Sequence, residues 1–239
     1  MQSAKDGMLG RLLSSVDDDG NPLTETQLID NLLFLIFAGF DTTKSSFGSL
    51  WFNLLEHPDI CDMLHKEVQG FSDPLDADEL KSAPLLNAVL AETWRLAAPI
   101  NSHSTIAKYD LEYKGYKYPK GTVFSVDTQA YHVTNEERFP ESRTFRVERW
   151  LPPGHPLHNP KYYNGINYNV MSTKYRPFSV GAHMCLGAHF AKLEVRVVAT
   201  RLIQKYHIET RNEQVRQFPT FQRYSDFKLT ERDNNKKSI

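Results

Sequence analysis

The feature that most constrains this chain is one long apolar segment near its N-terminus. Thr24 is followed three residues later by Gln27, which is the spacing of a capping box that begins a helix. Apolar residues then recur at helical spacing up to Pro58, and this pattern predicts one helix of roughly 30 residues. The predicted helix is apolar on much of its circumference, and such helices are usually buried at the centre of a larger fold.

The remaining sequence predicts further helices and a smaller amount of strand. Helices are expected over 58–71, around 85–94 and after Gly187, where apolar residues again follow helical spacing. Short alternating stretches over 111–127, interrupted by glycine and proline, predict hairpins. The proline-rich stretch 150–177 predicts a long irregular loop. We therefore expect a mainly α fold with a small β component, and we see no linker that would divide the chain.

Composition and charge exclude several classes of function. The chain has 239 residues and a formal net charge of -1, and its longest run of basic residues is one Lys-Lys pair in the tail. This distribution gives no indication of nucleic-acid binding. The best apolar run, Leu32–Phe37, is too short for a membrane span. Two cysteines, Cys61 and Cys185, are too few for a disulfide scaffold.

An interruption in the long helix is the first candidate site. In the hexamer AGFDTT, residues 38–43, Gly39 weakens the helix by about 1 kcal/mol relative to alanine. Threonine side chains in a helix also bond back to carbonyls of the preceding turn. The carboxyl group of Asp41 and the hydroxyl group of Thr42 could hold a small ligand beside the helix and deliver protons to it. On its own, such a hexamer is more often a packing contact between small residues.

The second candidate is the pair Glu92 and Arg95, three residues apart on one helical face. A pair of this kind is normally exposed and contributes only a few tenths of a kcal/mol. If Arg149, in the stretch FRVERW, folds back onto the pair, the three charges form a buried network. Such a network fixes geometry more than it stabilises the fold.

The third candidate is the stretch RPFSVGAHMCLGAHFAKLE, residues 176–194, which places Cys185 between two glycines ahead of a predicted helix. Gly181 and Gly187 allow the backbone to approach a ligand closely, and amides at a helix N-terminus stabilise a thiolate. A lone cysteine is more often an inert buried residue, which is our interpretation of Cys61. Zinc is not expected, because a closed site needs four ligands and no second cysteine or spaced histidine pair accompanies Cys185.

The third stretch resembles the haem loop of the cytochrome P450 family. Phe178, Gly181, Cys185 and Gly187 match the family pattern F-x-x-G-x-x-x-C-x-G. His183 stands where the family usually has arginine or histidine. A chance match to a single motif is common, so this match does not identify the family by itself.

The other two candidates resemble motifs of the same family and occur in family order. Glu92 and Arg95 resemble its E-x-x-R helix, and Arg149 resembles the third member of its Glu-Arg-Arg network. Residues 38–43 resemble the A-G-x-D-T-T of its central helix, and 115–124 resemble the hairpin that follows E-x-x-R. The resemblance covers nearly the whole chain and implies the C-terminal half of the P450 fold.

The resemblance also implies a haem-dependent monooxygenase and a role for each matching residue. Cys185 would be the thiolate ligand of the iron of haem b, and an axial thiolate favours O–O cleavage. Phe178 would pack near this ligand, and His183 would donate to a haem propionate. Thr42 would hold a proton-supplying water, and Asp41 would relay protons from solvent.

The implied partners are a small lipophilic substrate, dioxygen and an electron-donating reductase. The motif wording is closest to the group that oxidises sterols, retinoids and terpenoids.

Family chains are considerably longer, so we expect the N-terminal half of the fold to be absent and an apolar patch of the central helix to be uncovered. Two alternatives remain open: a non-catalytic truncated fragment that folds incompletely or only binds a partner, and a helical interaction module with an inert cysteine.

Overall fold

The computed structural model describes residues 7–169, 172–210, 216–217, 223–224 and 227–232. The chain forms two compact units, Met1–Thr42 and Thr43–Ile239. The boundary between them falls inside a continuous helix, which explains why the sequence shows no linker there.

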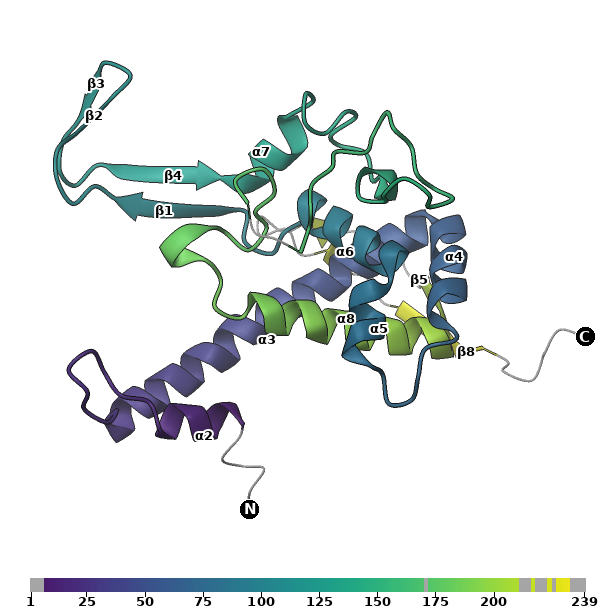
Figure 1. The fold of residues 1–239 in the computed structure, drawn as a ribbon, viewed down its shortest axis with the longest axis horizontal. Helices are drawn as coiled ribbons and strands as arrows, with labels where there is room; N and C mark the ends of the chain where they lie inside the picture. The colour runs from purple at the N-terminus through teal and green to yellow at the C-terminus, as the bar shows by residue number, and fades with distance from the viewer. Residues whose placement is uncertain (1–6, 170–171, 211–215, 218–222, 225–226, 233–239) are drawn as a thin grey trace, which may run out of the picture. The chain divides into compact units, whose positions relative to one another are not determined.

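Helices dominate the described residues, and the strands form small antiparallel pairs (Figure 1). The helices are α2 (Met8–Leu13), α3 (Glu25–Glu56), α4 (Pro58–Val68), α5 (Ala77–Ser82), α6 (Pro84–Leu96), α7 (Thr128–Thr134) and α8 (Ala188–Lys205), with single 3-10 turns η1 (Val147–Arg149) and η2 (Gly181–His183). The paired strands are β1 (Ser102–Ile106) with β4 (Val123–Asp127), β2 (Leu111–Tyr113) with β3 (Tyr116–Tyr118), β5 (Tyr206–Thr210) with β8 (Phe227–Glu231), and β6 (Arg216–Gln217) with β7 (Arg223–Tyr224). The predicted class, mainly α with a small β component, is confirmed.

The long predicted helix is α3, which runs for 32 residues. Its capping box is confirmed, because the Thr24 N–H donates to Gln27 Oε1 at 2.8 Å and the Gln27 N–H donates to Thr24 Oγ1 at 3.3 Å. Further along, Thr42 Oγ1 donates to the Ala38 carbonyl at 2.7 Å, which is the predicted bond back to the preceding turn. None of the described helices is long and apolar enough to cross a membrane.

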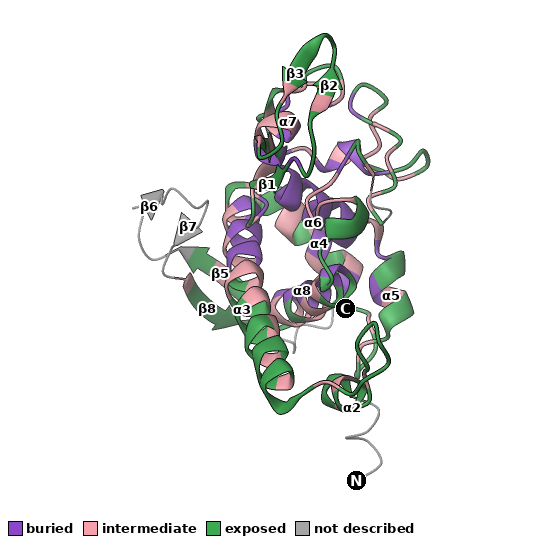
Figure 2. Cartoon of the chain, turned by 90° about the vertical axis from the view of Figure 1, so that its left-hand side faces the viewer, coloured by how far each residue is buried: buried purple, intermediate pink, exposed green. Residues whose placement is uncertain are grey.

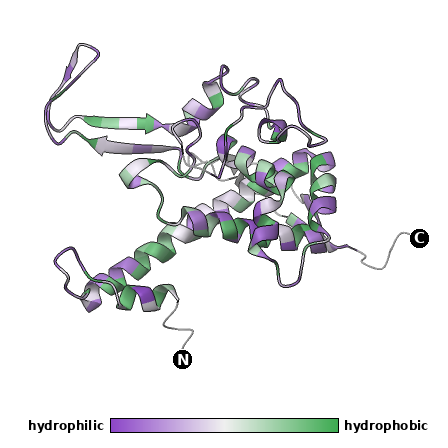
Figure 3. Cartoon of the chain, in the orientation of Figure 1, coloured by the Kyte–Doolittle hydropathy of each residue, from purple (hydrophilic) through white to green (hydrophobic). Residues whose placement is uncertain are grey.

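The two halves of α3 differ in burial, and the more exposed first half is also the more apolar one (Figures 2 and 3). The second half is buried at Ser46, Leu50 and Leu54, among others. The first half exposes large apolar side chains, including Phe34 and Phe37, the latter 75% exposed. Burial is therefore found in the second half only, and the first half carries the uncovered apolar patch that the sequence led us to expect.

Helix α6 is the most deeply buried element of the second unit, and every residue from Leu85 to Arg95 is buried (Figure 2). Its N-terminal N–H groups at Leu85 and Leu86 both donate to the Glu67 carboxylate at 2.8 Å, and this anchors α6 to α4. Helix α6 also packs against α5, α7 and η1, while α8 packs against α4 and α5. The helices that carry Glu92 and Arg95 and that follow Cys185 therefore belong to one core within the second unit.

The sequence patterns missed several elements. Helices α5 and α7 are short, and neither was predicted. The strands β1, β5 and β8 were also missed, and α4 ends at Val68, three residues earlier than predicted. Residues 150–177 contain no helix or strand among those that the structure describes, which agrees with the predicted irregular loop.

Candidate functional site

Glu92, Arg95 and Arg149 lie together in the core of the second unit. Glu92 and Arg95 come from α6, and Arg149 comes from the 3-10 turn η1. Arg95 Nε lies 2.8 Å from Glu92 Oε2, and Arg149 Nε lies 3.1 Å from Glu92 Oε1. All three residues are 0% exposed, so this is a buried network and not a surface ion pair.

Additional donors and acceptors surround the network. The Glu92 carboxylate also accepts bonds from the Trp150 indole N–H at 2.9 Å and from the Arg146 backbone N–H at 2.9 Å. Arg95 Nη1 donates to the carbonyl of His132 at 2.8 Å. Because charged groups in the core are costly unless they are paired and hydrogen-bonded, these partners make the burial of Glu92 and Arg95 possible.

His132 is a buried residue that the sequence did not identify. It lies in the short helix α7, and its Nε2 accepts the Arg176 backbone N–H at 3.3 Å. Burial, followed by the charges of Arg95 and Arg176, lowers the pKa of His132 to about 3, so the imidazole is neutral near pH 7. His132 thus connects the Glu92 network to the start of the cysteine loop. No periodicity marks it, and the sequence signal available was the cap at Asp127.

The cysteine loop places Cys185 just before α8, and the thiol is exposed and free. The Cys185 N–H donates to the Phe178 carbonyl at 2.9 Å, which closes the loop. Gly181 has a φ of 76°, a conformation that glycine adopts at little cost, and its carbonyl accepts the Met184 N–H at 3.1 Å. The Cys185 carbonyl accepts the Ala188 N–H at 3.3 Å, where the helix begins.

The surroundings of Cys185 leave its thiol accessible to a ligand. Residues 181–187 are all exposed, including His183, and Leu186 is 89% exposed. A Cβ added at Gly181 or Gly187 would meet no other atom within 4 Å, so open space lies beside both. The described residues contain no group of three His, Cys, Asp or Glu side chains that could hold a metal ion by themselves. A single accessible thiol fits haem, since some haem proteins hold the iron by one cysteine thiolate.

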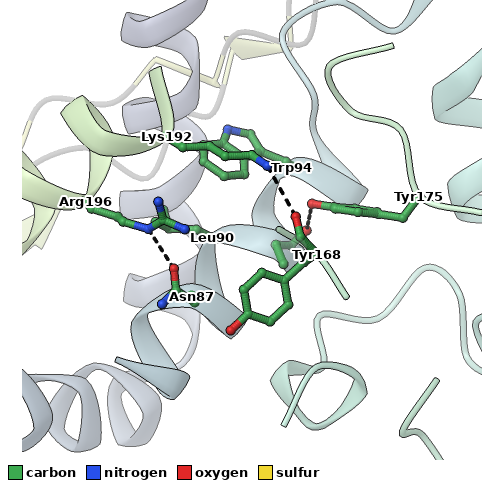
Figure 4. A pocket seen from close by; sticks show the side chains of 8 residues that line it. Asn87, Leu90, Trp94, Tyr168, Tyr175, Lys192 and Arg196 are labelled. Atoms are coloured by element: carbon green, nitrogen blue, oxygen red, sulfur yellow. Dashed lines mark hydrogen bonds between the residues drawn. The ribbon is translucent and has the colours of Figure 1, made fainter. Parts of the chain in front are cut away.

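A small pocket lies between α6 and α8 (Figure 4). Its lining includes Trp94, Tyr168, Lys192 and Arg196, and Arg196 Nε donates to Asn87 Oδ1 at 2.7 Å. The cavity volume is about 10 Å³, which is room for about one water molecule. This pocket is therefore too small for an organic substrate.

Asp41 and Thr42 are neighbours in the middle of α3, and both are half-buried. They are the last residues of the first compact unit, whereas Cys185 and the Glu92 network belong to the second. Cys61 lies in α4 and is half-buried, and burial raises the pKa of its thiol.

Comparison with known proteins agrees with this fold. The family model for cytochrome P450 matches residues 2–233. The chain therefore belongs to the cytochrome P450 family.

The curated relatives include a putative cytochrome P450 and a mitochondrial sterol 26-hydroxylase. A putative cytochrome P450 120 of Synechocystis sp. is 33% identical over 205 residues, which are 85% of this chain and 44% of the relative. The mitochondrial sterol 26-hydroxylase of Rattus norvegicus is 34% identical over 181 residues, which are 73% of this chain and 32% of the relative. The chain thus spans less than half the length of these curated relatives.

The solved structures show the same fold. The structure of the retinoic-acid-bound cyanobacterial CYP120A1 has a TM-score of 0.80 and 31% identity, and the match covers 95% of this chain and 51% of that one. The haem domain of cytochrome P450DA has a TM-score of 0.78 at 20% identity, and this likeness concerns the fold alone. Membership of the family implies a haem cofactor held by a cysteine thiolate.

Proposed function

We propose that this chain is the haem-ligating part of a monooxygenase that inserts one oxygen atom of dioxygen into a small lipophilic substrate. The observation that carries the proposal is the exposed Cys185 thiol on a closed loop, in a chain of the cytochrome P450 family. When bound, haem supplies an iron centre that activates dioxygen, and a thiolate ligand favours O–O cleavage.

The loop residues take the binding roles. Cys185 binds the iron through its thiolate, and the hydrogen bond from its N–H to the Phe178 carbonyl holds it in place. The open space beside Gly181 and Gly187 supports a close approach of the porphyrin to the backbone. His183 is exposed on the same loop. Its place in the family motif is that of the residue that donates to a propionate, which is the role proposed for it.

The proton-transfer roles fall to Asp41 and Thr42, on the strength of the family motif. Thr42 Oγ1 donates its proton to the Ala38 carbonyl, and a hydroxyl oxygen that donates in this way can also accept a hydrogen bond, which is the role proposed for it toward a water molecule. The Asp41 carboxylate takes up a proton from solvent and passes it to such a water. These two residues therefore control proton supply, and Glu92, Arg95 and Arg149 fix the scaffold geometry.

The proposed substrate class is lipophilic, and a reductase supplies the electrons. Support comes from relatives named as sterol 26-hydroxylases and as a lanosterol demethylase, and from a structural neighbour solved with retinoic acid. Sterols, retinoids and terpenoids are the compounds to test first.

The test is the absorption spectrum of the reduced, carbon-monoxide-bound protein expressed from its own gene. We expect the Soret band after which the family is named, since this band requires a thiolate ligand. Cys185→Ser should abolish the band, while Cys61→Ser, at the other cysteine, should leave it unchanged. A normal band in Cys185→Ser would remove Cys185 from the proposed role.

A further inference from the structure

The ring of Phe178 contacts both an aromatic side chain and a cation. Trp94 of α6 meets it edge-on, with ring centroids 5.1 Å apart and an interplanar angle of 75°. The ammonium of Lys192, on α8, lies 5.4 Å from the Phe178 ring centroid. Phe178 is also the residue whose carbonyl accepts the Cys185 N–H, so the ring contacts and the loop closure meet at the same residue.

Lys192 is an unusual lysine because it is only 5% exposed. Its Nζ donates to the Tyr168 carbonyl at 3.3 Å, and no ion pair joins it to a carboxylate among the residues that the structure describes. Burial, and the neighbouring charge of Arg196, lower the pKa of Lys192 to about 8, so it stays mostly charged at pH 7. A buried cation needs compensation, and an aromatic face supplies it more effectively when water is excluded.

Trp94 is itself fixed in place. Its indole N–H donates to Ser46 Oγ on α3 at 3.1 Å, and the side chain is 5% exposed. Ser46 and Trp94 both lie in the buried part of the second unit. The Phe178 ring therefore contacts a tryptophan that is itself fixed, and Lys192 makes a second contact with the same ring.

We propose that Lys192 is a positioning residue for the cysteine loop. Its ammonium holds the Phe178 ring against Trp94, and this keeps the Phe178 carbonyl where it accepts the Cys185 N–H. The importance of this geometry for iron binding rests on the proposed role of Cys185 as the ligand.

Hydrogen exchange of the haem-free protein tests the proposal without relying on the cofactor. The readout is the exchange rate of the Cys185 amide, compared with amides of α6. Lys192→Met keeps the length of the side chain and removes its charge. Because cation–π contacts contribute about 1 to 2 kcal/mol when desolvated, exchange at Cys185 should accelerate roughly 5- to 30-fold. The amides of α6 should not change.

Two matched variants complete the experiment. Lys192→Arg keeps a cation over the ring and should restore slow exchange at Cys185. Lys205→Met removes an exposed lysine from the last turn of the same helix and should change nothing. Equal acceleration in α6 and at Cys185 would show that Lys192 serves global stability only, and would overturn the proposal. Unchanged exchange in Lys192→Met would overturn it as well.

A spectroscopic measurement separates this inference from the proposed function. In haem-loaded protein, Lys192→Met should lower the share of the carbon-monoxide complex that shows the thiolate band, and Lys192→Arg should restore it. If the wild-type protein never shows the band, the proposed role of Cys185 fails while the exchange result still stands. If the band and the exchange rate are both normal in Lys192→Met, only the positioning role fails.

Discussion

The Glu92 network and the Cys185 loop belong to the same compact unit, but the network is buried and the loop is exposed. Glu92 is 0% exposed and accepts hydrogen bonds from two arginine side chains, an indole and a backbone N–H. The loop residues 181–187 are all exposed, and Leu186 is 89% exposed. The Glu92 carboxylate thus finds its partners within the chain, whereas the loop presents surface that a further molecule would cover.

This difference follows from the physical chemistry of the two regions. A buried carboxylate between two guanidinium groups has lost its water, so each remaining lone pair and N–H must find a partner in the protein. An exposed thiol loses nothing by staying in water. Exposed apolar side chains beside it, such as Leu186 and Phe190, are unfavourable until a ligand covers them, and a contiguous patch of this kind commonly marks a binding site.

Removal of the central carboxylate should have the largest effect. Glu92→Ala leaves the guanidinium groups of Arg95 and Arg149 buried without a counter-charge, and we expect a loss of about 3 to 5 kcal/mol in the free energy of unfolding. Urea denaturation followed by circular dichroism measures this loss. The control is Lys81→Ala, which breaks the exposed pair with Asp78 and should change stability by less than about 1 kcal/mol. Similar losses in both variants would remove the contrast between buried and exposed charge.

Acid should lower the free energy of unfolding through His132, the residue that connects the Glu92 network to the cysteine loop. Its pKa is about 3 in the folded protein and near 6.5 when unfolded, so the unfolded chain binds more protons between these values. The contribution to stability is therefore present above pH 6.5 and is lost as the pH falls toward 3. Between about pH 7.5 and pH 4.5 we expect roughly 2 to 3 kcal/mol of loss from this residue.

The variant His132→Gln isolates the contribution of His132, because it removes the titrating group and should flatten that part of the stability profile measured by urea denaturation. His189→Gln, at an exposed histidine on α8, serves as the control and should keep the wild-type slope. An identical pH dependence in wild type and His132→Gln would mean that His132 does not govern acid sensitivity.

Structural features that depend on residues close together in the sequence could be predicted from the sequence. The capping box of Thr24 and Gln27 joins residues three apart, and the structure has it as predicted. Helix α5 is short, so it lacks a readable periodicity, although Asp76 caps it by accepting the Asp78 N–H at 2.8 Å. A search for such acidic caps would have located α5 and also α7, which Asp127 caps in the same manner.

Non-local contacts were readable only in part. The sequence allowed a network if Arg149 folded back onto Glu92, but the separation of 57 residues gives no physical reason why it should. The donation of Trp150 to Glu92 and the contact of Lys192 with Phe178 depend on side chains from distant elements meeting in the core. The pairing of β5 with β8 is non-local in the same sense, and tertiary packing decides it.

The smallest effect is expected at Leu186, beside the thiol. In the haem-free protein, Leu186→Ala removes an exposed side chain and should change the free energy of unfolding by less than about 0.5 kcal/mol, whereas Leu86→Ala, at a residue that is 0% exposed in α6, should lose about 2 to 5 kcal/mol. Addition of haem sharpens the comparison. If the macrocycle covers the loop, Leu186 becomes partly buried, and its truncation should reduce haem affinity by roughly fivefold, equivalent to about 1 kcal/mol. Titration with haem, followed by absorbance, measures this change. Unaltered haem affinity in Leu186→Ala would show that the apolar surface beside Cys185 is not the surface that haem covers.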